Sequence, residues 1–321
     1  MPTTTPFKKH ITAFLEYLEV DRGLSNATIT NYSFYLHRFA DYIEEEANVL
    51  SVDKITKELV HKFRLYLNRL TDYKDEELLK KNTQNYHLIA LRGFLKYLAK
   101  NDIKSMAAEK IELAKQQERH VEFLEGDDLS RILAAPLKNG PVLSGAEGES
   151  LPGLRDKAML ELFFSTGLRV SELAKLNIED VNLSKDEFSI RGKGKKVRIV
   201  FLSDEAKTWI KKYLDKRQDL NPFLFINVDR ANKNQDGGLT PRSIERIVAK
   251  YAKNAGIMKQ VTPHTLRHSY ATDLLINGAD IRSVQAMLGH SSITTTQVYT
   301  HITDKQLREV HKNFHDKKKA K

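Results

Sequence analysis

The sequence predicts a mainly α-helical protein of two domains, with one small antiparallel sheet in the second domain. Apolar residues recur at helical spacing through the first hundred positions, where no alternation with a period of two appears. That alternation does appear at 186–190 and 196–202, on either side of a glycine-containing turn. With 321 residues, of which 40% are hydrophobic, the chain is long enough to bury a sizeable core.

The first domain is expected over residues 1–103 as a set of helices. Four apolar stripes predict them: one from Phe14 that ends near Gly23, one that follows Ser25, one that Thr56 can cap, and one over 88–98. Residues 104–121 are polar and lack both glycine and proline. We therefore expect them to form an interdomain linker that is partly helical.

The second domain is expected over residues 122–315 and is mostly helical, followed by a disordered basic tail at 316–321. A surface loop is predicted at 138–153 from its content of Gly, Pro and Ser. The strong helical pattern that comes next ends at Gly167. DEFSI and KVRIVFL then predict a β-hairpin around the basic turn RGKGKK, after which helical patterns resume.

The charge and the missing cysteines narrow the class of protein. A formal net charge of +10 favours a polyanionic partner, because Lys and Arg release counterions from a phosphate backbone. A basic protein that binds nothing acidic is the alternative that charge leaves open. The absence of cysteine excludes disulfides, thiolate zinc sites and cysteine nucleophiles. No apolar run is long enough to cross a bilayer and no secretory signal is visible, so a cytoplasmic protein without a membrane partner is expected.

Four short segments of the second domain carry residue types suited to phosphate chemistry. Arg169, in STGLRVSEL, lies just beyond the glycine that ends a helix. A guanidinium at a helix start can bind a phosphate with two hydrogen bonds, although a surface arginine would look the same. Lys193, between two glycines in RGKGKK, could contact a base edge or protonate a leaving group. A basic turn that is only solvated is the alternative.

The third segment, TPHTLRHSYATDLL, places His264 and Arg267 in the first turn of a helix that Pro263 can start. Two donors at the positive end of a helix make an anion site. His264 and His268 also have the spacing of zinc-binding helices, but Thr265 stands where that motif has Glu, and Arg267 would repel a cation. No metal and no cofactor are therefore expected.

The fourth segment, LGHSSITTTQVYTH, contains His290 and Tyr299. A phenol has a pKa near 10 and is mostly neutral at pH 7. Tyr299 is one of twelve tyrosines in the chain, and only its neighbours in this set distinguish it from the other eleven. Cationic neighbours favour the phenolate and stabilise the charge of a pentacoordinate phosphate. Two arginines and two histidines would supply this without a metal ion, and the carboxylates of a two-metal nuclease are not evident.

The six residues and their local sequences resemble those of the tyrosine recombinases, or phage-integrase family, with the greatest likeness to the Xer branch that resolves chromosome dimers. The matching segments are TGLRVSEL, GKGKK, HTLRH, LGHSS and VYTH, which carry Arg169, Lys193, His264 with Arg267, His290 and Tyr299. The likeness covers residues 155–301, and the first hundred residues resemble the helical, SAM-like core-binding domain of the family.

The resemblance implies a role for each of these residues. The two arginines would hold the non-bridging oxygens of the scissile phosphate. His264 would be a general base or an oxyanion donor, and His290 a second donor. The lysine would protonate the departing 5′-oxygen, and the tyrosine would form a 3′-phosphotyrosyl bond that a free 5′-hydroxyl then attacks.

The resemblance also implies partners: double-stranded DNA with a specific recombination site, a homotetramer or heterotetramer on that DNA, and a DNA translocase at the division septum. Segment 304–314 has Leu307, Val310 and Phe314 on one stripe, suited to docking on a neighbouring protomer or, alternatively, on its own domain. The loop at 138–153 is longer than Xer sequences carry there. An integrase of a mobile element, a type IB topoisomerase and a non-catalytic DNA-binding regulator stay open as alternatives.

Overall fold

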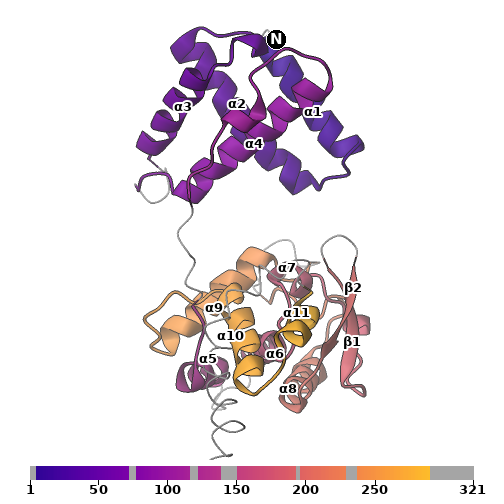
Figure 1. Cartoon of the computed structure of the whole chain (residues 1–321). Coiled ribbons are helices and arrows are strands. Elements are labelled where there is room, and N and C mark those ends of the chain that lie inside the picture. The colour runs from indigo at the N-terminus through magenta and orange to yellow at the C-terminus, as the bar shows by residue number, and fades with distance from the viewer. Residues whose placement is uncertain are drawn as a thin grey trace, which may run out of the picture. The chain divides into compact units, whose positions relative to one another are not determined.

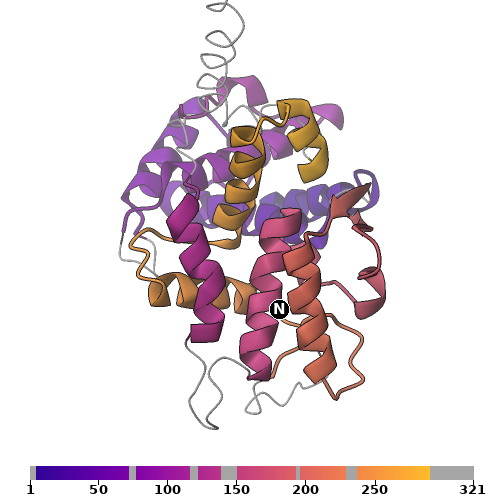
Figure 2. The same cartoon turned by 90° about the horizontal axis from the view of Figure 1, so that it is seen from below.

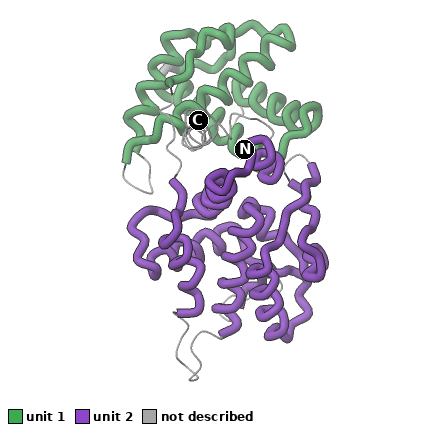
Figure 3. The backbone as a smooth tube through the Cα atoms, turned by 60° about the horizontal axis from the view of Figure 1, so that its bottom comes forward, with its two compact units in different colours: residues 1–118 green, residues 119–321 purple. Residues whose placement is uncertain are grey.

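The computed structural model describes residues 5–71, 77–115, 122–138, 150–192, 196–228 and 237–289. The chain divides into two compact units, residues 1–118 and 119–321 (Figure 3). Both are built mainly from helices, and within the described ranges the only sheet has two strands (Figure 1). These observations confirm the predicted fold class.

Four α-helices account for most of the first unit. They are α1 (Pro6–Val20), α2 (Asn26–Ala47), α3 (Lys57–Arg69) and α4 (Lys81–Lys100). Two single-turn 3₁₀ helices, η1 (Val52–Lys54) and η2 (Ala108–Lys110), follow α2 and α4. The four apolar stripes correspond to these four helices, and the Thr56 side chain accepts a hydrogen bond from the Leu59 amide, as the predicted cap requires (3.2 Å).

Phenylalanine rings from all four helices form the centre of the first unit. Phe7, Phe14, Phe39, Phe63 and Phe94 are buried, and four contacting pairs among them have ring centroids 4.9 to 6.1 Å apart. Burying a phenylalanine side chain contributes roughly 1.5–3 kcal/mol. The apolar stripe of each helix therefore faces one shared core.

The first part of the predicted linker packs on this core. Met106, Ala108 and Ile111 are buried against it. The Asn85 side chain donates to the Ala114 carbonyl at 2.9 Å and accepts from the Ala114 amide at 3.0 Å. The charged residues between these apolar positions hide the pattern, but the segment up to Leu113 contributes to the first unit rather than to a free tether.

The described part of the second unit contains seven α-helices and a hairpin. The helices are α5 (Gly126–Lys138), α6 (Leu151–Thr166), α7 (Val170–Leu173), α8 (Asp204–Lys216), α9 (Pro241–Asn254), α10 (Pro263–Ile276) and α11 (Ile281–Leu288), with a 3₁₀ turn η3 (Ile178–Asp180) after α7. Helix α6 packs against α5, α8 and α10 (Figure 2). Its residues are buried on nearly all sides. It therefore forms the centre of this unit.

The predicted hairpin is confirmed as an antiparallel pair. Strand β1 (Glu187–Arg191) runs against β2 (Val197–Phe201), with Glu187 opposite Phe201 and Arg191 opposite Val197. Phe188, Ile190 and Val200 are buried on the inner face. The turn residues 193–195 lie outside the described ranges.

Two helices begin earlier than the hydrophobic pattern predicts. Helix α1 starts at Pro6 rather than near Phe14, and Thr5 caps it by accepting from the Lys8 amide (3.4 Å). Helix α6 starts at Leu151, inside the stretch 138–153 that was predicted to be a loop, and Ser150 caps it. In both cases a Ser or Thr N-cap is followed by a proline in the first turn of the helix. These residue types are common at helix starts and also in loops, so composition alone does not distinguish the two. Residues 139–149 of the predicted loop are not among the described residues.

Glycines end the two helices that lead to the candidate site. Gly167 closes α6 with φ +56°, and Gly289 closes α11 with φ +62°, both in the left-handed region that glycine adopts most easily. The predicted end of α6 at Gly167 is thus confirmed. No helix in the described ranges is both long and apolar enough to span a membrane.

Candidate active site

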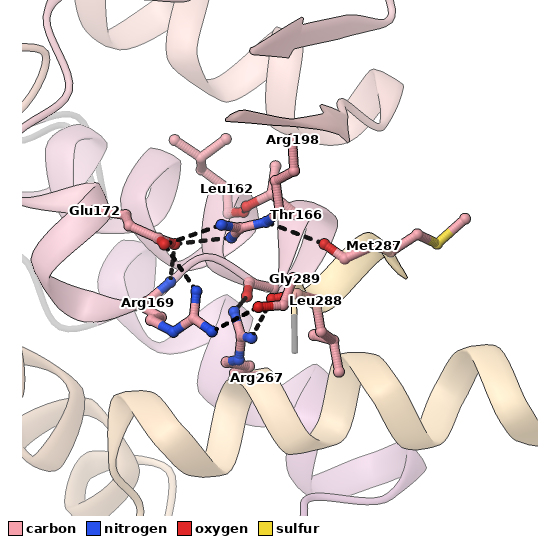
Figure 4. Close-up of polar contacts among 10 residues, drawn as sticks. Leu162, Thr166, Arg169, Glu172, Arg198, Arg267, Met287, Leu288 and Gly289 are labelled. Carbon is pink, nitrogen blue, oxygen red and sulfur yellow. Dashed lines mark hydrogen bonds and ion pairs between the residues drawn. The ribbon is translucent and has the colours of Figure 1, made fainter. Parts of the chain in front are cut away.

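Five segments of the second unit meet at the end of α11. They are the end of α6, the start of α7, the middle of β2, the first turns of α10, and residues 287–289 (Figure 4). Among the described residues, three guanidinium groups and one carboxylate lie at this point, and they come from three regions that are distant in the sequence. This cluster is the candidate active site.

Arg267 lies in the second turn of α10 and is buried, with 4% of its surface exposed. Its guanidinium donates to the Gly167 carbonyl at the end of α6 and to the Leu288 carbonyl at the end of α11 (2.5 Å for the latter). These carbonyls lie at the negative ends of two helices, where a cation is stabilised. The sequence predicts Arg267 near the positive end of its own helix, α10. The carbonyls that it contacts lie at the negative ends of two other helices, α6 and α11.

Arg169 is the N-cap residue of α7, as the sequence predicts for a helix start. Its guanidinium donates to Glu172 at 2.9 Å and to the Gly289 carbonyl at 3.1 Å, and 29% of the side chain is exposed. The carbonyls bound by Arg169 and Arg267 belong to consecutive residues, so α11 brings the two guanidinium groups to one place.

Glu172 connects the arginines of the cluster. Its carboxylate accepts from the Arg169 side chain and backbone amide, and from both terminal nitrogens of Arg198 at 2.9 and 2.8 Å. Burial alone would raise the pKa of Glu172, but the hydrogen bonds from Arg198 and from the Arg169 amide outweigh it and lower the pKa to about 2. The carboxylate therefore stays ionised throughout the neutral range.

Sequence reasoning did not single out Glu172 or Arg198, yet each had a local signal. Glu172 stands three residues after the N-cap, where a glutamate accepts from the N-cap amide in a capping box. Arg198 shares the inner face of β2 with Val200, and a charged residue on the buried face of a strand needs a partner. The capping box identifies the Arg169 amide as one partner of Glu172, but neither signal pairs Glu172 with Arg198.

His264 and His268 lie one turn apart on α10. His264 is exposed and His268 is partly buried, with ring centroids 6.2 Å apart. Across the described ranges no group of three or more His, Asp or Glu side chains is placed to hold a metal ion. Of the other predicted site residues, Lys193, His290 and Tyr299 lie outside the residues that the structure describes.

Glu172 is expected to make the stability of the second unit depend on pH in acid. Because its pKa is lower in the folded protein than its ordinary value of 4.5, its stabilising effect is present above pH 4.5 and is lost as the pH falls towards 2. The shift corresponds to at most about 3 kcal/mol. Urea unfolding of the wild type and of Glu172→Gln over about pH 3 to 6 measures this. The variant should be less stable near pH 6 and lose less on acidification; parallel curves would contradict the prediction.

Gly167→Ala is expected to destabilise the second unit by about 1–3 kcal/mol. Gly167 has φ +56°, and an added Cβ would overlap the ring of Tyr270, which is buried beneath it. Gly278→Ala is the matched control, since Gly278 also has positive φ (+95°) but nothing lies within 4 Å of an added Cβ. Thermal unfolding of the two variants separates backbone strain from the steric clash. Equal losses would show that the contact with Tyr270 does not matter.

Comparisons with known proteins agree with this architecture. The phage integrase family model matches residues 122–306, and the model for the phage integrase N-terminal SAM-like domain matches residues 11–102. The tyrosine recombinase XerD of Listeria innocua is 36% identical over 310 residues, which cover 94% of this chain and 97% of that protein. The tyrosine recombinase XerC of Thermodesulfovibrio yellowstonii is 36% identical over 320 residues, covering 98% and 97%.

A solved structure extends the likeness to three dimensions. The site-specific recombinase XerH bound to palindromic difH substrate, in a post-cleavage complex, aligns with a TM-score of 0.70 at 22% identity, covering 97% of this chain and 90% of that one. The protein is a DNA strand-transferring enzyme, a site-specific recombinase. The chain belongs to the phage integrase family.

Proposed function

We propose that the arginine pair at the end of α11 binds the scissile phosphate of a DNA strand and that Tyr299 attacks this phosphate. One observation carries the proposal. Arg169 and Arg267 donate to consecutive carbonyls at the end of α11, immediately before the segment that carries the tyrosine. Guanidinium groups bind phosphate oxygens with directed, charge-assisted hydrogen bonds, so two of them beside the nucleophile's segment make a phosphate clamp.

The remaining predicted residues complete the chemistry of cleavage. The phenol oxygen of Tyr299 bonds to phosphorus as the bond from phosphorus to the 5′-oxygen breaks. His264 accepts the phenol proton, Lys193 donates a proton to the 5′-oxygen, and His290 donates a hydrogen bond to the phosphate. Rejoining runs the same steps in reverse with the 5′-hydroxyl of a partner strand. The 3′-phosphotyrosyl bond of the intermediate conserves the energy of the broken phosphodiester bond, so the proposed reaction uses neither ATP nor a metal ion.

The proposed assembly consists of four protomers on two DNA duplexes. Recombination joins strands from two sites, and each site has two cleavage positions. The stripe of Leu307, Val310 and Phe314 is suited to linking neighbouring protomers, and it lies outside the described residues. Many Lys and Arg contacts to the DNA backbone would provide affinity, and contacts to base edges would select the site.

The proposed biological role is resolution of chromosome or plasmid dimers, with a DNA translocase at the division septum as a further partner. The similarity to XerD and XerC proteins over nearly their whole length supports this role. Integration of a mobile element is the second candidate, since a transposon integrase bound to transposon end DNA shares the fold (TM-score 0.69, 17% identity).

Covalent capture tests both the chemistry and the role. Sequencing the DNA bound covalently to this protein in its own cells should yield a single chromosomal or plasmid site, whereas the ends of a mobile element would support integration. A nicked suicide substrate built on the captured site should then trap the protein, and mass spectrometry should place the nucleotide on Tyr299. Attachment to another residue would contradict the proposed nucleophile.

A further inference from the structure

Arg198 uses all three guanidinium nitrogens inside the protein. It lies in the middle of β2, and 10% of its side chain is exposed. Its two terminal nitrogens donate to the two carboxylate oxygens of Glu172, at 2.9 and 2.8 Å, and its Nε donates to the Met287 carbonyl at 3.1 Å (Figure 4). Arg198 and Glu172 thus form a bidentate ion pair, and the Nε of Arg198 makes a third hydrogen bond in a different direction, to Met287.

These bonds join three segments that each lead to a proposed catalytic residue. Glu172 binds the Arg169 side chain and its amide, so it sets the position of one arginine of the clamp. Met287 lies at the end of α11, where the carbonyls that contact both clamp arginines follow directly. Strand β2 belongs to the hairpin whose turn contains Lys193.

Two glycines leave the space that the Arg198 side chain fills. A Cβ on Gly289 would lie 2.8 Å from Cδ of Arg198, which is closer than such atoms approach. A Cβ on Gly192 would lie 3.2 Å from a terminal nitrogen of Arg198 and 3.2 Å from the Glu172 carboxylate. The backbone at Gly192 and at Gly289 therefore lies too close to the Arg198 side chain for a larger residue to fit without a shift.

We propose that Arg198 is a positioning residue for strand cleavage, which holds Glu172 and the end of α11 so that Arg169 is oriented towards the phosphate. The inference rests on the proposed function of Arg169. Each of the three guanidinium nitrogens of Arg198 donates to Glu172 or to Met287, so its contacts lead to Arg169 and to the end of α11. A lysine at position 198 keeps the charge but lacks the planar guanidinium group, so it does not maintain the contacts with both Glu172 and Met287.

A buried ion pair can also serve stability alone, so the test must separate the two roles. Residues that act as a unit show non-additive losses, whereas independent destabilisation adds. The informative comparison is therefore between Arg198→Lys, Arg169→Lys and the double variant. Arg246→Lys is the matched control, because Arg246 is an exposed arginine on α9, outside the four segments proposed to carry the chemistry.

The measurements are single-turnover cleavage of a suicide substrate, the Kd for the same DNA, and the melting temperature. We expect Arg198→Lys to cleave about 10- to 100-fold more slowly, with a Kd within about threefold of the wild type. The double variant should be within about threefold of the slower single variant. The control should cleave like the wild type.

Wild-type cleavage by Arg198→Lys, or a double variant as slow as the product of the two single effects, would overturn the inference. If Arg198→Lys does not fold, Arg198→Met with Glu172→Gln leaves no buried charge of this pair unpaired and takes its place in the same assays. If Arg169→Lys itself cleaves normally, the proposed clamp is wrong and this inference fails with it. If Arg169→Lys is slow and Arg198→Lys is not, only the role of Arg198 is refuted.

Discussion

Tyr299→Phe is expected to abolish the covalent adduct between this protein and DNA, while the Kd for DNA changes by no more than about threefold. The substitution removes the single oxygen that would bond to phosphorus and leaves the ring and its packing in place. Adduct formation on a suicide substrate, followed by denaturing gel electrophoresis, measures the first effect. An electrophoretic mobility shift measures the second.

Tyr270→Phe provides the control for loss of a phenol near the arginine cluster. The Tyr270 hydroxyl contacts the sulfur of Met287 at 3.7 Å, and burial raises its pKa, an effect that Arg267 and Arg198 partly offset. A buried phenol with a raised pKa is a poor nucleophile, so this variant should still form the adduct. Trapping of DNA by Tyr299→Phe would show that another residue is the nucleophile.

Arg267→Ala is expected to raise the barrier to strand cleavage by several kcal/mol, on the order of a hundredfold or more in rate. The guanidinium is preorganised by the Gly167 and Leu288 carbonyls and is proposed to meet the charge that develops on the phosphate. DNA binding should weaken far less, because many other Lys and Arg contacts share the phosphate backbone. Single-turnover cleavage rates and DNA affinities of the same preparation measure the difference.

Folding must be controlled in this experiment, because Arg267 is buried. Removing its side chain leaves two carbonyls without this donor, at a cost of about 1–3 kcal/mol each in stability. Arg267→Lys keeps the charge, and its melting temperature reports how much of the loss is structural. Arg246→Ala, on an exposed part of α9, removes the same charge elsewhere and should leave cleavage nearly unchanged. Equal losses in cleavage and binding for Arg267→Ala would argue against a role in the transition state.

Local signals predicted much of the fold. Helical spacing identified the four helices of the first unit, and period-two alternation identified β1 and β2. The apolar stripe begins at Phe14 and does not show the start of α1 at Pro6, which Thr5 caps. The start of α6 differs from the prediction because proline and serine at 138–153 favour a loop, whereas Ser150 is a helix cap. The burial of Met106 and Ile111 was missed because charged neighbours mask two isolated apolar residues.

Motifs predicted some residues of the described arginine cluster, but the hydrogen bonds that join the cluster were not predictable. Motifs singled out Arg169 and Arg267, and the structure brings both to the end of α11. The roles of Glu172 and Arg198 depend on contacts between a helix, a strand and a second helix end that are distant in the sequence. Such contacts arise only from tertiary packing, so no local pattern predicts them.

The ion-pair network also sets the charge stoichiometry of the site. Among the described residues of the cluster, the guanidinium groups of Arg169, Arg198 and Arg267 and the carboxylate of Glu172 sum to +2 (three minus one). A phosphodiester carries one negative charge, and its pentacoordinate transition state carries two. In the proposed mechanism these four groups would therefore match the charge of the transition state better than that of the bound substrate, and this difference would favour cleavage. Glu172 stays ionised throughout the neutral range, so its contribution to this charge does not change with pH there.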